Sequence, residues 1–342
     1  MEKNSIREDQ PSLKIVAGLG SIDDYLAYVE AGADEVFAGY VPQCWQEKYG
    51  LTTPLNRREV CYYNVQIGSE SELEILADMV KSAKVPVTLA FNGLHFREEQ
   101  LPMIAGILED CLSLGFDSVI LADLSLMVYL HEVGLSEKLK IHVSGEFGEI
   151  DHWMVRELQR LGVSRLIFHR KVSLENMEAI IREQRQWEQL KQLEKQEQMR
   201  KQTPGQWQEL PSMEFEAFIL NENCHFNGAF CNSLHCDELV PMCRMPYRLS
   251  QIGKVCAEGT EASAAAAEEA VDSAAGQTEE ANDNERAEDF GYDYGLKDLD
   301  KMKTIGITHL KVVGRGADGE YMTRCIQKVS EEVSREVNKS DV

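Results

Sequence analysis

Four of the nine cysteines in this chain gather in the segment 221–247. They have the spacing C-x6-C-x4-C-x6-C and are Cys224, Cys231, Cys236 and Cys243. Thiolate is the soft ligand that iron–sulfur clusters and zinc both prefer. A cubane cluster is larger than one ion, so the wide gaps favour an iron–sulfur cluster over zinc. His225 and His235 keep zinc as an alternative, and reduced, buried thiols are a third.

The elements that position this segment are predicted from eight short apolar or β-branched runs. Most of these runs, which indicate strands, are followed by an amphipathic stretch that indicates a helix. The predicted strands cover residues 13–19, 35–39, 85–91, 118–122, 140–143, 165–168, 214–220 and 309–313. Leu73, Leu76, Ala77 and Val80 have helical spacing and predict a helix over Glu70–Ala83. Eight strands that alternate with helices are typical of the α/β class with a (β/α)8 TIM-barrel-like fold, which needs about 250 residues.

The rest of the 342 residues indicates a cysteine-rich loop and two insertions in this barrel. We expect a barrel domain over 12–256 and 291–325. Segment 182–202 holds six Lys or Arg, four Glu and seven Gln, which predicts a projecting, charged helix. Segment 257–290 holds eleven Asp or Glu and one Arg. It has too little apolar surface to offset chain entropy, so we expect an acidic, disordered insertion.

Charge and hydropathy exclude several classes of protein. The chain has 35 Lys or Arg and 58 Asp or Glu, a net charge of −23, of which −10 lies in segment 257–290. A broad phosphate-binding field is therefore not expected. No apolar run approaches the roughly 20 residues of a membrane span, and residues 1–11 are polar. We expect a cytoplasmic protein that does not interact with membranes.

Two motifs give the chain a resemblance to a known family. The run from Glu214 to Leu220, followed by Cys224 and Cys231 with Gly228 between them, resembles the strand-then-cysteine signature of the collagenase-like U32 peptidase family. The run 306–315, with Lys311, Gly314 and Arg315, is similar to that family's Lys-hydrophobic-Glu-Gly-Arg element, with Val313 in place of the Glu. Three further places agree: Phe91-Asn92, His142-Val-Ser144, and Arg170 before Ser173-Leu174.

The resemblance implies a barrel-type catalytic domain and a 4Fe-4S cluster held by four cysteines. Characterised members of the family are oxygen-independent hydroxylation factors for RNA bases or for a quinone precursor ring, with prephenate as oxygen source. The family name records a collagenase-like protease activity. Cys236 and Cys243 come earlier than the family's third and fourth cysteines, so Cys256 is a possible substitute ligand. A paired family paralogue is a further partner that the resemblance suggests.

Polar residues at the predicted strand ends are the candidate site, because functional groups of a (β/α)8 barrel gather at the C-terminal ends of its strands. We expect His142 to move a proton, with Asp123 and Glu146 to orient it or to balance the cations. The expected substrate-binding residues are Asn92, Ser144, Arg170, Lys311 and Arg315. The three cations suit a small dicarboxylate such as prephenate. Each of these residues taken singly has a structural alternative, which is to satisfy buried polar groups.

Three functions therefore compete. The first is an iron–sulfur enzyme that hydroxylates an RNA base or a small aromatic substrate. The second is a peptidase acting on a protein substrate, although the sequence holds no H-E-x-x-H and no G-x-S-x-G. The third is a non-catalytic scaffold that uses the charged helix and the acidic segment. The charge balance favours a small-molecule or protein-bound substrate over RNA.

Overall fold

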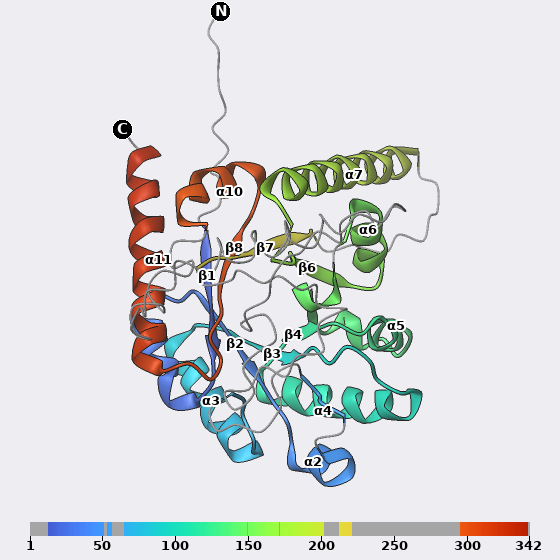
Figure 1. Ribbon diagram of the computed structural model, residues 1–342. Helices are drawn as coiled ribbons and strands as arrows, with labels where there is room; N and C mark the ends of the chain where they lie inside the picture. The colour runs from blue at the N-terminus through green and yellow to red at the C-terminus, as the bar shows by residue number, and fades with distance from the viewer. Residues whose placement is uncertain are drawn as a thin grey trace, which may run out of the picture.

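The computed structural model describes residues 13–50, 53–56, 65–148, 150–170, 172–201, 212–220 and 295–340. Eight parallel strands form one closed barrel in which each strand pairs with its neighbours in the sequence and β8 pairs with β1 (Figure 1). The strands are β1 Lys14–Leu19, β2 Glu35–Gly39, β3 Val87–Phe91, β4 Ser118–Leu121, β5 Lys140–Val143, β6 Val163–Ile167, β7 Glu214–Phe218 and β8 His309–Val312. The predicted (β/α)8 fold is confirmed, and every predicted strand is present with ends shifted by at most two residues.

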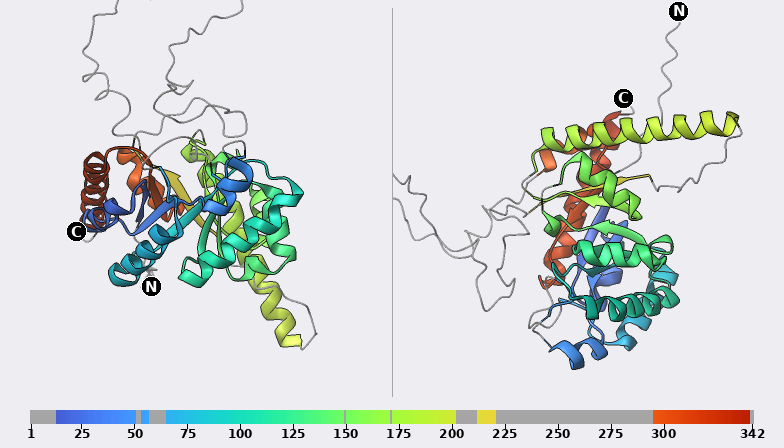
Figure 2. Two further views of the ribbon diagram at one scale, coloured as in Figure 1. Left: turned by 90° about the horizontal axis from the view of Figure 1, so that it is seen from below. Right: turned by 90° about the vertical axis from the view of Figure 1, so that its right-hand side faces the viewer.

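Helices surround the barrel, as connections between parallel strands require (Figures 1 and 2). The α-helices are α1 Tyr25–Glu30, α2 Gln43–Tyr49, α3 Glu70–Ala83, α4 Leu101–Leu114, α5 Leu124–Glu132, α6 His152–Arg160, α7 Leu174–Lys201, α10 Leu299–Ile305 and α11 Gly319–Ser340. Short 3-10 turns are η1 Ile22–Asp24, η3 Glu98–Gln100, η4 Leu135–Glu137, η5 Gly145–Phe147 and η8 Leu296–Asp298. Each described helix is too short or too polar to span a bilayer.

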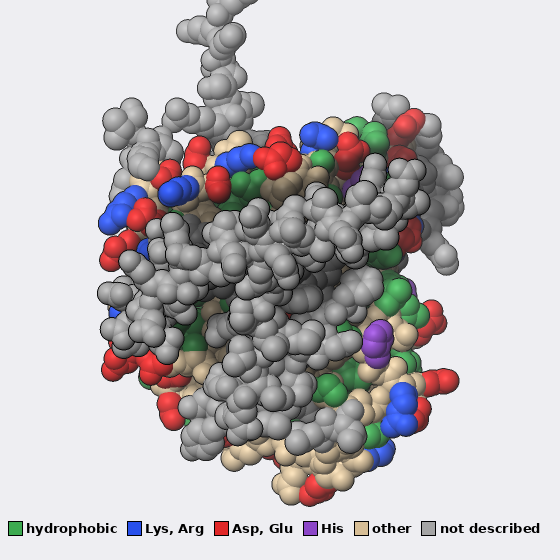
Figure 3. Space-filling model, in the orientation of Figure 1, with side chains coloured by type: hydrophobic (Ala, Val, Ile, Leu, Met, Phe, Trp, Pro, Cys, Tyr) green, Lys and Arg blue, Asp and Glu red, His purple; other side chains and the backbone are tan. Residues whose placement is uncertain are grey.

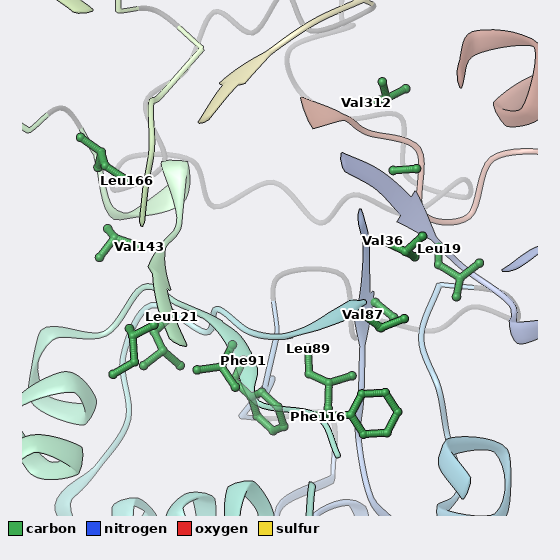
Figure 4. Close-up of a cluster of buried hydrophobic side chains, with 14 of the residues drawn as sticks. Leu19, Val36, Val87, Leu89, Phe91, Phe116, Leu121, Val143, Leu166 and Val312 are labelled. Carbon is green, nitrogen blue, oxygen red and sulfur yellow. The ribbon is translucent and has the colours of Figure 1, made fainter. Parts of the chain in front are cut away.

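The main core lies between the barrel and the helices. Side chains that point outward from the strands, including Leu19, Val36, Leu89, Leu121 and Val143, are buried there (Figure 4). Helix α3 adds Leu73, Leu76 and Ala77, three of the four positions whose spacing predicted it. Since both faces of such a sheet are covered, the strands consist largely of buried residues.

The interior of the barrel has two different layers. An apolar layer contains Val16, Phe37, Ala90, Ile120, Ile167 and Phe218. A charged layer contains Glu35 on β2, Arg165 on β6 and Glu216 on β7. On each of these strands the charged residue precedes the residue of the apolar layer by two positions. Period-two alternation along each strand places these charges beneath the apolar layer, inside the barrel.

Helix α7 contains the segment 182–202 that the sequence predicted to project, except for its last residue, and it starts earlier, at Leu174. Its first turns are packed, with Met177 and Ile181 buried, whereas Leu190 and Leu193 are 59% and 60% exposed. Figure 2 shows the C-terminal half of α7 extending beyond the barrel, and Figure 3 shows acidic and basic side chains intermixed along the edge where α10 and α7 lie. Segment 257–290 lies outside the described residues.

Candidate active site

A pocket opens at the C-terminal ends of the strands and collects most of the predicted site. Its polar lining comes from six of the eight predicted catalytic and binding residues: Asn92, Ser144, Glu146, Arg170, Lys311 and Arg315. Its apolar lining includes Phe37, Ile120, Ile167 and Phe218, which are the upper layer of the barrel interior. The pocket therefore has an apolar floor with charged groups around it.

Arg170 lies between an acid and an aromatic ring. Its Nη1 donates to Oε1 of Glu146 at 3.0 Å, and its guanidinium carbon lies 4.1 Å from the centre of the Phe218 ring. Both ionic side chains are almost fully buried. Since the ring restrains one face of the guanidinium and Glu146 holds one edge, the cation has a defined orientation toward the pocket.

Lys311 on β8 lies at the junction of the pocket and the charged layer. Its Nζ donates to Oε1 of Glu216 at 2.7 Å and lies 3.6 Å from the centre of the Phe37 ring. Burial lowers the pKa of Lys311, and although Glu216 opposes this, the charges of Arg165 and Arg315 add to it, so that the pKa stays below its ordinary value. Lys311 is thus a cation whose charge is unusually easy to remove.

Arg315 reaches the pocket because β2 ends in a glycine, Gly39, which leaves space for the guanidinium. A Cβ built on Gly39 would lie 2.5 Å from Nη1 of Arg315. The same Nη1 donates to Oδ1 of the fully buried Asn56 at 3.2 Å. Gly39 therefore leaves the space that the guanidinium occupies, and Asn56 orients it.

Asn92 and Ser144 form the opposite part of the lining. Nδ2 of Asn92 donates to Oγ of Ser144 at 3.3 Å, and the same Oγ accepts the backbone N–H of Glu146 at 3.1 Å. Ser144 thereby caps η5, which places Glu146 where Arg170 meets it. These contacts make Ser144 an orienting residue for the turn.

Beneath the pocket, Arg165 is the centre of a buried ionic network. Its guanidinium binds both oxygens of Glu35, at 2.7 and 3.0 Å, and donates to Glu216 at 3.1 Å and Glu214 at 2.8 Å. His309 Nε2 lies 3.1 Å from Glu35. Burial opposes the ionisation of Glu35, but hydrogen bonds from His309 and Arg165 outweigh it and hold the pKa of Glu35 well below its usual range. The pKa of Glu216 is lowered likewise, because Lys311 and Arg165 outweigh its burial.

His142 and Asp123 are not part of the pocket lining. His142 is buried on β5 in the charged layer, where burial and the nearby charge of Arg165 keep its pKa well below the ordinary value. Asp123 is the N-cap of α5, and its two oxygens accept the backbone N–H groups of Leu126 and Phe96, each at 2.8 Å. The contacts of Asp123 are therefore those of a structural cap, and a catalytic role for either residue stays a prediction.

The pH dependence of stability follows from these shifts. A group whose pKa is lower in the folded state stabilises the fold above its unfolded pKa and loses that contribution as the pH falls. We expect the free energy of unfolding to fall below about pH 6.5 because of His142, and again below about pH 4.3 because of Glu35 and Glu216. Urea unfolding from pH 8 to pH 3 measures both steps. His142→Gln should remove the first step and leave the second; an unchanged first step would contradict the assignment.

The four predicted cluster ligands, Cys224, Cys231, Cys236 and Cys243, lie outside the described residues, as does Cys256. Within the described ranges no group of three or more His, Cys, Asp or Glu side chains is placed to hold a metal ion. The described residues on either side of the undescribed segment 221–294 lie close together next to the pocket. Phe218 lines the pocket, and a Cβ on Gly295 would lie 3.5 Å from Ile219 and 3.8 Å from the carbonyl oxygen of Phe218.

The fold and the site define a (β/α)8-barrel protein with a cationic pocket at the C-terminal mouth of its barrel. The sequence profile of peptidase family U32 matches residues 20–341, and the chain belongs to this family. No curated protein matches the chain.

Solved structures similar to this chain include a member of the same family. The U32 peptidase Mk0906 shares 16% identity with a TM-score of 0.40, over 63% of this chain and 71% of that one. KGPDC from Streptococcus mutans shares 9% identity with a TM-score of 0.43, over 95% of this chain and 98% of that one. A putative fructose-1,6-biphosphate aldolase from Coccidioides immitis shares 9% identity with a TM-score of 0.43, over 94% and 90% of the two chains.

Proposed function

We propose that this U32-family chain is an iron–sulfur enzyme that binds a small carboxylate donor, prephenate, at the barrel mouth and hydroxylates an RNA base or a small aromatic substrate without oxygen. The observation that carries the proposal is the convergence of three cations, Arg170, Lys311 and Arg315, on one pocket whose floor holds two phenylalanine rings. Carboxylates need cationic hydrogen-bond donors, and a ring needs an apolar surface.

The described residues divide the work of binding. Arg170 and Arg315 are suited to the two carboxylates, because a guanidinium offers paired donors that match a carboxylate. Phe37 and Phe218 flank the cations and supply the apolar surface. Glu146, paired with Arg170, limits the positive charge of the pocket and is an oxygen acceptor beside it. Such a site selects a compact dianion over an extended nucleic-acid backbone.

The 4Fe-4S cluster would be held by Cys224, Cys231, Cys236 and Cys243. The alternative is that these cysteines hold a zinc ion. When bound, such a cluster supplies one-electron redox chemistry. Chain length supports a position beside the pocket: Cys224 comes four positions after Leu220, and four residues of extended chain span at most roughly 14 Å. Ile219 and Leu220 follow the pocket residue Phe218 directly, which supports a cluster site near the mouth.

Metal analysis of the full chain tests this proposal. After anaerobic purification we expect about four irons and four sulfides per chain, both lost in Cys224→Ala. Cys44→Ala is the matched control, because Cys44 is an exposed, free cysteine on α2, and it should keep the full iron content. One zinc per chain, or no metal in the wild type, would reject the cluster and bring forward the peptidase or scaffold function.

A further inference from the structure

Proton transfer at the pocket requires a group that lines it and can change its charge. Among the residues that the structure describes, four ionisable ones line the pocket, namely Glu146, Arg170, Lys311 and Arg315. Guanidinium groups stay protonated in proteins, so Arg170 and Arg315 act as fixed charges. Glu146 accepts a hydrogen bond from Arg170, so its contact at the pocket is that of an acceptor. Lys311 remains as the acid.

The surroundings of Lys311 are those of a positioned ammonium group. Its Nζ is held from below by Glu216 at 2.7 Å and from the side by the ring of Phe37 at 3.6 Å. Glu216 is 1% exposed and is anchored by Arg165 at 3.1 Å, so it cannot leave Lys311 for solvent. The opening of the pocket is the remaining approach to Nζ among the described residues, since Lys311 itself lines it.

We infer that Lys311 is a catalytic acid of this site, which donates a proton to an oxygen of the bound anion, and that Glu216 is its positioning residue. The inference rests on the proposed function for the identity of the anion. In the step, an Nζ–H bond breaks, its electron pair stays on nitrogen, and the proton bonds to a ligand oxygen that gains negative charge. The neutral amine then regains a proton from water, while Glu216 stays ionised throughout.

Charges on neighbouring elements adjust Lys311 for this role. Glu216 on β7 favours the ammonium form, whereas Arg165 on β6, Arg315 after β8 and the buried surroundings favour the neutral amine. The charge of Lys311 also acts on His142 on β5, where it adds to the burial and the charge of Arg165 that lower the pKa of the imidazole. Glu146, which accepts a hydrogen bond from Arg170 at the same pocket, is an acceptor on the lining that Lys311 shares.

Competitive acetylation of the full anaerobically purified chain tests this inference without any substrate. Acetic anhydride reacts with neutral amines, and mass spectrometry reports the labelling of Lys311 as a function of pH. We expect Lys311 to reach half-maximal labelling at a lower pH than the exposed Lys138. In Glu216→Gln the ammonium loses its counter-ion, so labelling at pH 7.5 should rise about tenfold, the change expected for one pKa unit.

Glu35→Gln is the matched control, because Glu35 shares Arg165 with Glu216, whereas the 2.7 Å contact of Lys311 is made to Glu216. Its labelling should stay close to wild type. A Lys311 profile equal to that of Lys138, no labelling at any pH, or equal effects of the two glutamine variants would overturn the inference. If Glu216→Gln does not fold, the wild-type comparison with Lys138 still decides.

Prephenate and a second variant separate this inference from the proposed function. Prephenate should protect Lys311 from acetylation; a shifted profile without protection would reject prephenate as the donor and keep Lys311 as the acid. Lys311→Arg keeps a positive charge but cannot release a proton. We expect it to keep the KM for prephenate and to lose about 10²- to 10⁴-fold in kcat, as removal of a general acid does. An unchanged kcat would assign Lys311 to binding alone.

Discussion

Replacement of Arg165 by methionine should lower the free energy of unfolding by about 3–5 kcal/mol, the cost of leaving buried charges without their partner. Arg165 is itself buried and binds Glu35, Glu216 and Glu214 at once. Glu35 and Glu216 lie deep in the barrel, and without the guanidinium they must either stay charged in a poor solvent or take up protons. Methionine preserves most of the side-chain volume, so the loss measures charge rather than packing.

Urea unfolding at pH 7 measures the effect, and two controls define its origin. Arg160→Met removes an arginine whose ion pair with Glu157 is exposed, and its effect should be small. The double variant Arg165→Met/Glu35→Gln should be more stable than Arg165→Met, because it removes one of the unpaired charges. Equal stabilities of the single and double variants would show that the cost comes from packing.

The same variant has a weaker dependence of stability on pH than the wild type. Without Arg165, Glu35 and Glu216 keep His309 and Lys311 as partners, but burial is less compensated and the pKa of each carboxyl group rises relative to the wild type. The variant therefore loses part of the stability that these groups contribute to the wild type above their unfolded pKa. The difference between wild type and Arg165→Met should therefore be larger at pH 7 than at pH 4.

The barrel was predictable from the sequence because its signals are local. Runs such as 85–91 and 118–122 are short and mostly apolar, and helix α3 has an apolar stripe with Ser69 as its N-cap. The closed order of the strands followed from their number. Most of the pocket lining was also predictable, because residues within three positions of the C-terminal end of a strand, such as Asn92 and Arg170, must lie at one end of the barrel.

The buried network was missed because its members are far apart in the sequence. Arg165 and Glu35 are 130 residues apart, and on a single strand a charge looks like a solvent-facing position. A signal was nevertheless present. Strands of a closed parallel barrel have both faces buried, so Glu214, Glu216 and Lys311 at alternate strand positions must face the interior and require partners of opposite charge.

Asp123 shows a different limit of prediction by strand ends. An Asp that follows a strand can serve either a site or the next helix, and here α5 begins one residue later. The contacts of Asp123 support the role of a helix cap, since both of its carboxylate oxygens accept backbone N–H groups. His142, one position before the end of β5, lies below the pocket, whereas Ser144, the residue that directly follows the strand, lines it.

Replacement of Arg315 by methionine should weaken prephenate binding about 10- to 100-fold. A charge-assisted hydrogen-bonded contact contributes about 1.5–3 kcal/mol, and each 1.4 kcal/mol is tenfold in affinity. Arg315 lines the pocket together with Lys311. It is only 5% exposed, so it is not a general surface cation. Calorimetric titration of prephenate into the full chain measures the loss. Arg324→Met on α11 is the control, because its arginine is exposed and does not line the pocket.

A steric variant tests the same contact without removing the charge. Gly39→Ala places a methyl group 2.5 Å from Nη1 of Arg315, so the guanidinium must move from its position beside Asn56. We expect an affinity loss that approaches that of Arg315→Met, together with unchanged net charge. Gly106→Ala is the matched control, because a Cβ at Gly106 meets nothing within 4 Å. If Gly39→Ala binds prephenate as the wild type does while Arg315→Met does not, charge at the mouth governs recognition and the exact placement of the guanidinium does not.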